Sequence, residues 1–170
     1  MLSMPSPEPP NLHLLNAAIG WVELGNPAEA RCELAQVDPA CHMHPDFLEV
    51  RWSICAAEEN WPEALEAARA LLGVAPDRCS GWIHQAYALR RVPEGGVVGA
   101  WHALLPAFDK FPNVALVSFN LACYACLLRH LDAARVWLKR ALVIGKHEKI
   151  KEMALAEPDL RPLWGEIPQL

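Results

Sequence analysis

Residues 116–142 of the chain read LVSFNLACYACLLRHLDAARVWLKRAL, and the stretch predicts two helices joined by a short polar turn at Arg129-His130. The first half is dominated by small and apolar side chains, which let two helices approach closely. In the second half, Ala134, Leu138 and Ala141 are spaced four and three residues apart, so they share one helical face. The stretch therefore predicts a helical hairpin.

The same pattern recurs along the chain. The alanine of the second helix returns after 34, 36 and 34 residues, at Ala134, Ala100, Ala64 and Ala30. The first helix has equivalent positions at Ala122, Ala86, Trp52 and Ala18. Both series contain one longer step, so an insertion is predicted between Ala86 and Ala100, where Gly95-Gly96 favours a loop. A period of about 34 residues built from helix-turn-helix units is typical of tetratricopeptide repeats.

The chain resembles the tetratricopeptide repeat (TPR) family over roughly residues 11–142. GNPAEA (25–30), ENWPEA (59–64) and LDAA (131–134) resemble the family's turn and the start of its second helix. Pro76 and Pro112 stand where the family ends a repeat with proline. The resemblance implies an all-α protein, a right-handed α-solenoid of about four TPR-like helix-turn-helix repeats plus a C-terminal capping helix.

The pattern also predicts how the chain is divided. We expect a disordered proline-rich leader over 1–10, repeats over 11–44, 45–78, 79–114 and 115–145, and a C-terminal cap over 146–170. Asn26 and Asn60 each precede a proline at a predicted helix start, so both are expected as N-caps, and Asp46 is a third candidate. The first helix of the third repeat is expected to run from about Cys79 to Arg91.

Composition restricts the classes of partner. The net charge of −5 is uneven, with −8 over residues 1–70 and +3 over residues 71–170. An acidic half argues against nucleic acid, whose phosphates need clustered Lys and Arg. No stretch approaches the ~20 apolar residues of a membrane helix, and MLSMPSPEPP lacks the features of a signal peptide. We therefore expect a cytoplasmic protein that binds neither nucleic acid nor membrane.

Two cysteine-containing motifs are candidate sites of chemistry. Cys123 and Cys126 form a C-x-x-C, but it lies within a predicted helix, where small core residues are the simpler interpretation. Cys41-His42-Met43-His44 is rich in metal ligands but offers no evident fourth ligand for a closed zinc site. No catalytic constellation is found, so we expect no enzyme activity, catalytic residue, resident metal or cofactor. A thiol-redox or metal-handling protein is retained as an alternative.

The resemblance implies a protein–protein interaction scaffold or adaptor, which binds a partner peptide or helix in a concave groove lined by the first helix of each hairpin. The groove residues that it implies are Asn16, Glu49, Ser53, His84, Tyr87, Arg90, Arg91, Phe119 and Asn120. Tyr87 and Arg91, four residues apart and expected on one helical face, form with Arg90 an aromatic-plus-arginine cluster typical of binding hot spots. A dedicated secretion-type chaperone of the TPR class is the alternative function, and coverage of the groove by the chain's own ends is the structural alternative. A second copy of the chain, which would give a homo-oligomer, is also retained as a partner.

Overall fold

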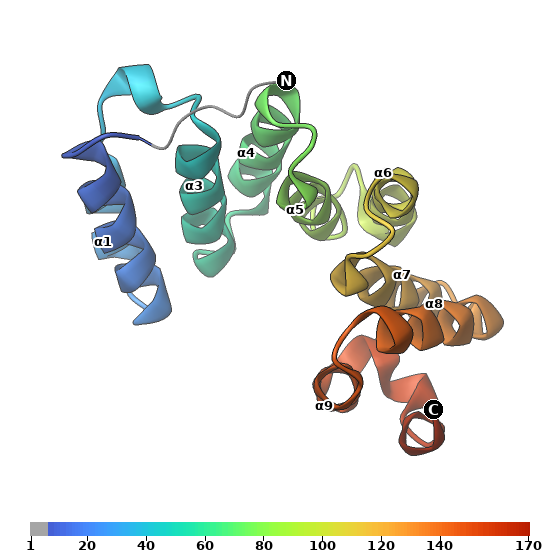
Figure 1. Ribbon diagram of the computed structural model, residues 1–170. Coiled ribbons are helices and arrows are strands. Elements are labelled where there is room, and N and C mark those ends of the chain that lie inside the picture. The colour runs from blue at the N-terminus through green and yellow to red at the C-terminus, as the bar shows by residue number, and fades with distance from the viewer. Residues whose placement is uncertain (1–6) are drawn as a thin grey trace. The chain divides into compact units, whose positions relative to one another are not determined.

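A computed structural model describes residues 7–170, so most of the predicted leader lies outside the described residues. These residues are helical or irregular, with no β-strand among them, and form two compact units, one ending at Ala88 and one spanning Leu89–Leu170 (Figure 1). The elements are α1 (Asn11–Glu23), α2 (Pro27–Leu34), η1 (Pro39–Cys41), α3 (Pro45–Ala57), α4 (Trp61–Val74), α5 (Cys79–Leu89), α6 (Gly96–Lys110), α7 (Ala115–Leu127), α8 (Leu131–Ile144), α9 (His147–Ala156), η2 (Pro158–Leu163) and η3 (Ile167–Gln169), where η marks a short 3-10 helix.

Unit 1, the part up to Ala88, contains two helical hairpins followed by α5. Helices α1 and α2 pack together, as do α3 and α4, and α3 also packs against both helices of the first hairpin. Ala30 and Ala64, two of the periodic alanines, are completely buried, as is Ala18. The small side chains thus lie at close approaches between helices, as the repeat pattern predicts.

The helix starts of unit 1 follow the expected chemistry with one exception. Asn26 and Asn60 both cap their helices, each accepting a hydrogen bond from the backbone N–H three residues later. The prediction for Asp46 is wrong: helix α3 already begins at Pro45, and His44 is the N-cap, its Nδ1 accepting from the Asp46 N–H at 3.2 Å. Proline at the first helical position lacks only an N–H that would have no partner there, so the helix can begin one residue before Asp46.

An ion-pair network joins three helices of unit 1. Arg31 of α2 binds Glu58 at the end of α3 and Glu63 of α4, and Arg51 of α3 also reaches Glu63 at 3.2 Å. Burial alone would raise the pKa of Glu63, but the two guanidinium groups lower it below its ordinary value. The network therefore links the first hairpin to the second by charge as well as by apolar packing.

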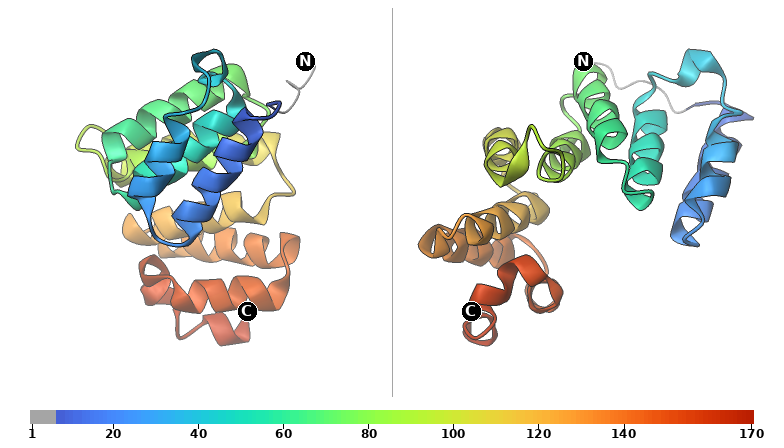
Figure 2. Two further views of the ribbon diagram at one scale, coloured as in Figure 1. Left: turned by 90° about the vertical axis from the view of Figure 1, so that its left-hand side faces the viewer. Right: turned by 180° about the vertical axis from the view of Figure 1, so that it is seen from behind.

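Unit 2, Leu89–Leu170, is built around α7, which is buried over most of its length. Helices α6 and α8 both pack with α7, and the periodic alanines Ala100 and Ala134 are completely buried. Helix α9 lies beside α8, and η2 and η3 follow it at the end of the chain (Figure 2). The C-terminal cap that the sequence predicts therefore contains α9 and two short 3-10 helices, whose Leu160, Leu163 and Ile167 are completely buried.

Gly145 permits a close approach where α8 ends. A Cβ atom at this position would lie 2.8 Å from Ile150 Cγ1, 3.1 Å from Ala115 Cβ and 3.1 Å from the Ala141 oxygen. Because those neighbours belong to α9, α7 and α8, the absence of a side chain lets the three helices meet. Gly145 therefore matters for packing within unit 2 rather than only as a helix stop.

Candidate functional site

A hollow of about 460 Å³ lies in unit 1 and is lined by the first helices of its hairpins and by α5. Its walls are of mixed apolar and polar character, and they are formed by Leu12, Leu15, Asn16, Ile19, Asp46, Glu49, Val50, Ser53, Ser80 and His84. Four of the nine predicted groove residues are thus brought together here: Asn16, Glu49, Ser53 and His84. We call this feature the unit 1 hollow.

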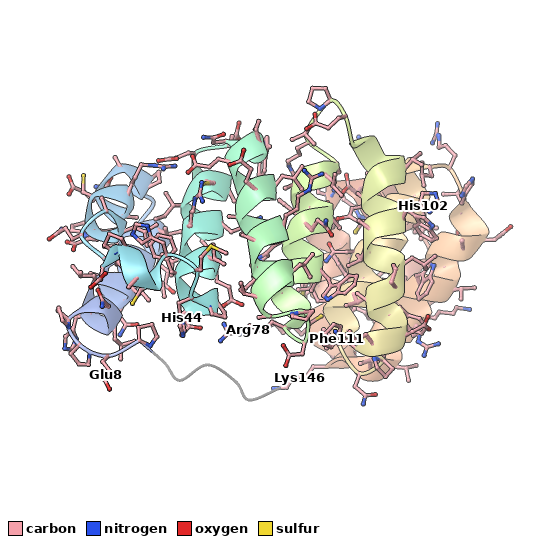
Figure 3. The ribbon with its side chains drawn as sticks, turned by 90° about the horizontal axis from the view of Figure 1, so that it is seen from above. Glu8, His44, Arg78, His102, Phe111 and Lys146 are labelled. Atoms are coloured by element: carbon pink, nitrogen blue, oxygen red, sulfur yellow. The ribbon has the colours of Figure 1, made fainter. Side chains whose placement is uncertain are left out.

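The acidic side of the hollow is an ordered cluster at the starts of α3 and α5. Arg78 binds Asp46 at 2.6 Å and approaches Glu49 at 3.5 Å, and Ser80 Oγ donates a hydrogen bond to Glu49. Burial works against the charge of Arg78, but the two carboxylates raise the pKa of its guanidinium. His44 and Arg78 mark this edge of unit 1 in Figure 3. Among the described residues, two carboxylates and no cation line the hollow itself.

His84 forms part of the hollow as a neutral aromatic ring. It stacks on Trp52 with ring centroids 3.8 Å apart and ring planes inclined by 4°. Within the described part of the chain, His84 Nδ1 and Trp52 Nε1 have no hydrogen-bond partner, and both atoms are buried. Burial lowers the pKa of His84 from 6.5 to about 4, so the ring carries no charge at neutral pH. It offers a partner an apolar face and leaves Asp46 and Glu49, whose two negative charges exceed the single positive charge of Arg78, as the charged groups of the wall.

Tyr87 lies one turn further along α5, outside the lining of the hollow. Its ring contacts Trp52 edge-on, with centroids 6.0 Å apart, and Trp61 at 5.8 Å. Helix α5 ends at Leu89, two residues before the predicted end, so Arg90 and Arg91 belong to the turn that follows. Tyr87 therefore lies in the last turn of α5, and Arg91 lies two residues beyond its end.

The remaining predicted residues belong to unit 2 and have other surroundings. Arg90 makes two hydrogen bonds to the carboxylate of Asp159 in η2, at 2.5 and 3.2 Å, and lies over the ring of Tyr124. Phe119 is buried with 4% of its surface exposed, whereas Asn120 is half-buried and donates to the Leu116 carbonyl at 3.0 Å. Arg90 and Phe119 are thus engaged within the unit itself.

The face of α7 that corresponds to the hollow is covered by the C-terminal segment. Helix α7 packs against η2, and Cys123 is only 2% exposed. Burial raises the pKa of the Cys123 thiol, and the nearby carboxylates of Glu157 and Asp159 raise it further. Asp159 belongs to η2 and Glu157 directly precedes it, so the C-terminal segment of the chain, from Glu157 onward, covers this position in unit 2.

Cys123 and Cys126 lack the surroundings of reactive thiols. Cys126 is buried like Cys123, and burial raises the pKa of its thiol too, whereas a reactive cysteine has a lowered thiol pKa. His42 stacks on Phe47 and its Nε2 lies 3.1 Å from the Val37 carbonyl, while His44 caps α3. Within residues 7–170, no group of three or more His, Cys, Asp or Glu side chains is arranged to hold a metal ion. The same residues contain no helix with the length and hydropathy of a membrane span.

Comparisons with known proteins identify the fold. No protein-family model matches the chain, and no curated protein sequence matches it. Among solved structures, a thermophilic TPR protein of Thermus thermophilus superimposes with a TM-score of 0.73 at 18% identity, over 94% of this chain and 100% of that one. The MamA RS-1 ArsTM double mutant gives 0.68 at 14% identity, over 82% of this chain and 77% of that one.

The fold class predicted from the repeat period is confirmed: the protein has an all-α, TPR-like fold of the α-solenoid type. At these identities, the likeness shows the fold alone.

Proposed function

We propose that this protein is a non-catalytic interaction scaffold whose partner-binding site is the unit 1 hollow. The observation that carries the proposal is the joint lining of one hollow by α1, α3 and α5. Helices that present both apolar and polar side chains to such a hollow can bind an extended peptide segment or a helix by contacting the side chains of that partner. Proteins of TPR-like fold generally bind other proteins, which agrees with this use.

The charges of unit 1 favour a basic partner segment. From its first charged residue, Glu8, to Ala88, unit 1 carries 4 basic and 12 acidic residues, a net charge of −8. The lining adds Leu15, Ile19 and Val50 as apolar contacts beside Asp46 and Glu49. We therefore propose a peptide or amphipathic helix that places an apolar side chain in the hollow and a Lys or Arg near the two carboxylates. The acidic cluster replaces Arg90 and Arg91 as the expected source of specificity.

A selection from a random library of displayed 16-residue peptides, with the full chain as bait, tests the proposal. Peptides that bind the wild type and not Ser53→Trp, which fills the hollow, are expected to contain Lys or Arg next to an apolar residue. A synthetic peptide from this set should bind Glu49→Gln about tenfold more weakly, because one carboxylate of the wall is neutralised.

The matched control is Glu66→Gln, because Glu66 is exposed on α4 and lies outside the lining. Circular dichroism melting should show that all three variants remain folded. If every selected peptide binds Ser53→Trp and Glu49→Gln as tightly as the wild type, the hollow is not the binding site.

A further inference from the structure

The outward face of α8 carries exposed valines where polar residues are usual. Val136 is 65% exposed and Val143 is 86% exposed, whereas Leu138, Ala141 and the rest of the inner stripe are buried. An amphipathic helix normally turns polar residues to water, and valine is a poorer helix former than Leu or Lys. Neither packing within unit 2 nor helix propensity accounts for these two side chains.

Two hollows adjoin this face. The larger, of about 440 Å³, is lined by Val136, Val143 and Ile144 together with Pro112, Lys139 and Arg140. The smaller, of about 290 Å³, shares Lys139 and Val143 with it. Lys139 and Val143 thus line both depressions, and the rise from Val136 to Val143, seven residues further along the chain, is about 10 Å along the helix axis. A helix lying alongside α8 can repeat this spacing with its own apolar side chains.

The charged side chains that line the two hollows are basic, whereas Asp132, one turn before Val136, is fully exposed and pairs with Arg135. Among the described residues, no acidic side chain lines either hollow, and both contain Lys139. Arg140 is held over the ring of Phe108, 4.0 Å from its centroid, which fixes the guanidinium at the surface. The carboxylate of Glu166, which interacts with Lys139 through space, is bound by Arg135 at 2.7 and 2.8 Å. Lys146, labelled in Figure 3, adds a further exposed cation directly after α8.

We propose that Val136, Lys139, Arg140 and Val143 form a second docking surface, which binds an acidic amphipathic helix of another protein. Apolar side chains of that helix enter the hollows on the two sides of Val143, and its carboxylates meet Lys139 and Arg140. Nucleic acid is the weaker interpretation, because a phosphate backbone is bound through several cations rather than around exposed valines. This surface lies wholly within unit 2, so it is independent of the unit 1 hollow.

Selection from a displayed library of helical 18-residue peptides tests the proposal, again with the full chain as bait. Binders that are lost on Val143→Glu are expected to carry Asp or Glu beside apolar residues at helical spacing. A synthetic peptide from this set should bind Val143→Glu and Lys139→Glu at least about tenfold more weakly, and its affinity should fall as salt is raised. Lys149→Glu, an equal change of charge at an exposed position on α9, and Ser53→Trp should leave its affinity within about twofold.

Several results would overturn the proposal. One is the absence of Val143-dependent binders, and another is a Val143-dependent set that is basic or uncharged. Sedimentation velocity would contradict it by showing a concentration-dependent dimer that Val143→Glu abolishes, because the occupant would then be a second copy of the chain. Binding of a DNA duplex or of phosphatidylserine vesicles that Val143→Glu abolishes would assign the surface to those partners instead.

Discussion

Equivalent positions of the repeat differ between the two units. Ile19 in α1 and Cys123 in α7 occupy the same place in their hairpins, yet Ile19 is 41% exposed at the hollow and Cys123 is 2% exposed beneath the C-terminal segment. In both units the repeat pattern specifies where the helix lies and which of its faces is buried within the hairpin. Whether the other face can bind a partner depends on what the rest of the chain places against it, which the repeat pattern does not specify.

The largest expected effect comes from loosening the segment that covers α7. Leu160 of η2 is completely buried, so Leu160→Ala should lower the free energy of unfolding by about 2–5 kcal/mol. Leu155→Ala, at an exposed position of α9, should change it by less than about 0.5 kcal/mol. Urea denaturation measures both. Equal small effects would mean that η2 contributes little to the packing of unit 2.

The hollow of unit 1 should show a pH dependence that comes from His84. Its pKa is about 4 in the folded chain and near 6.5 when unfolded, so from about pH 7 down to pH 4 the unfolded chain binds a proton that the folded chain does not. The free energy of unfolding should therefore fall with decreasing pH, by about 3 kcal/mol from this group at pH 4, and gain nothing from it above pH 7.

His84→Phe retains a ring over Trp52 and removes the titrating group. The difference in unfolding free energy between wild type and variant should therefore change with pH over this range, and denaturation at several pH values measures it. A difference that stays constant from pH 7 to pH 4 would show that His84 is not buried as a neutral ring.

A substitution at Arg90 tests whether this residue binds a partner or stabilises unit 2. Because it is half-buried and bound to Asp159, Arg90→Met should lower the free energy of unfolding by about 2 kcal/mol through loss of charged hydrogen bonds. Arg161→Met, at an exposed position of η2, is the matched control. Affinity for a peptide that binds the unit 1 hollow should be unchanged. Loss of that affinity without loss of stability would return Arg90 to the binding site.

Gly145 tests the close approach of helices in unit 2 with the smallest change. Gly145→Ala should lower the free energy of unfolding by about 1–2 kcal/mol, because the added methyl group meets Ile150, Ala115 and the Ala141 oxygen. Gly165→Ala, where a methyl group would meet nothing within 4 Å, should be close to neutral. Thermal melting of the two variants should separate them, and identical melting temperatures would contradict the packing described here.

The fold was accessible from sequence because its determinants recur. Ala30, Ala64, Ala100 and Ala134 are completely buried at the intervals that the sequence displays, and any one of them alone would have been ambiguous. The Asn caps were equally readable, since the side chain and the following proline act locally.

The candidate site was only partly accessible because it depends on contacts between distant residues. Asp46 and Ser80 line the hollow but were not predicted, and the pairing of Arg78 with Asp46 spans 32 residues. The ion pair of Arg90 with Asp159 spans 69 residues and holds a predicted hot-spot residue, half-buried, against η2. Asp46 and Ser80 are one repeat period apart, so the pattern could have placed them at equivalent positions of the second and third repeats. Nothing local to Arg90 indicated its partner.

The most direct test of the difference between the units is the rate at which thiols at equivalent positions are alkylated. Ile19→Cys places a thiol at the hollow, native Cys123 reports on α7, and exposed Cys32 serves as an internal standard. Peptide mapping by mass spectrometry after timed exposure to N-ethylmaleimide resolves the three sites in one molecule. The structure predicts that the thiol introduced at position 19 reacts at a rate close to that of Cys32, while Cys123 reacts only when unit 2 unfolds. Similar rates at positions 19 and 123 would contradict the covered α7 and the open hollow together.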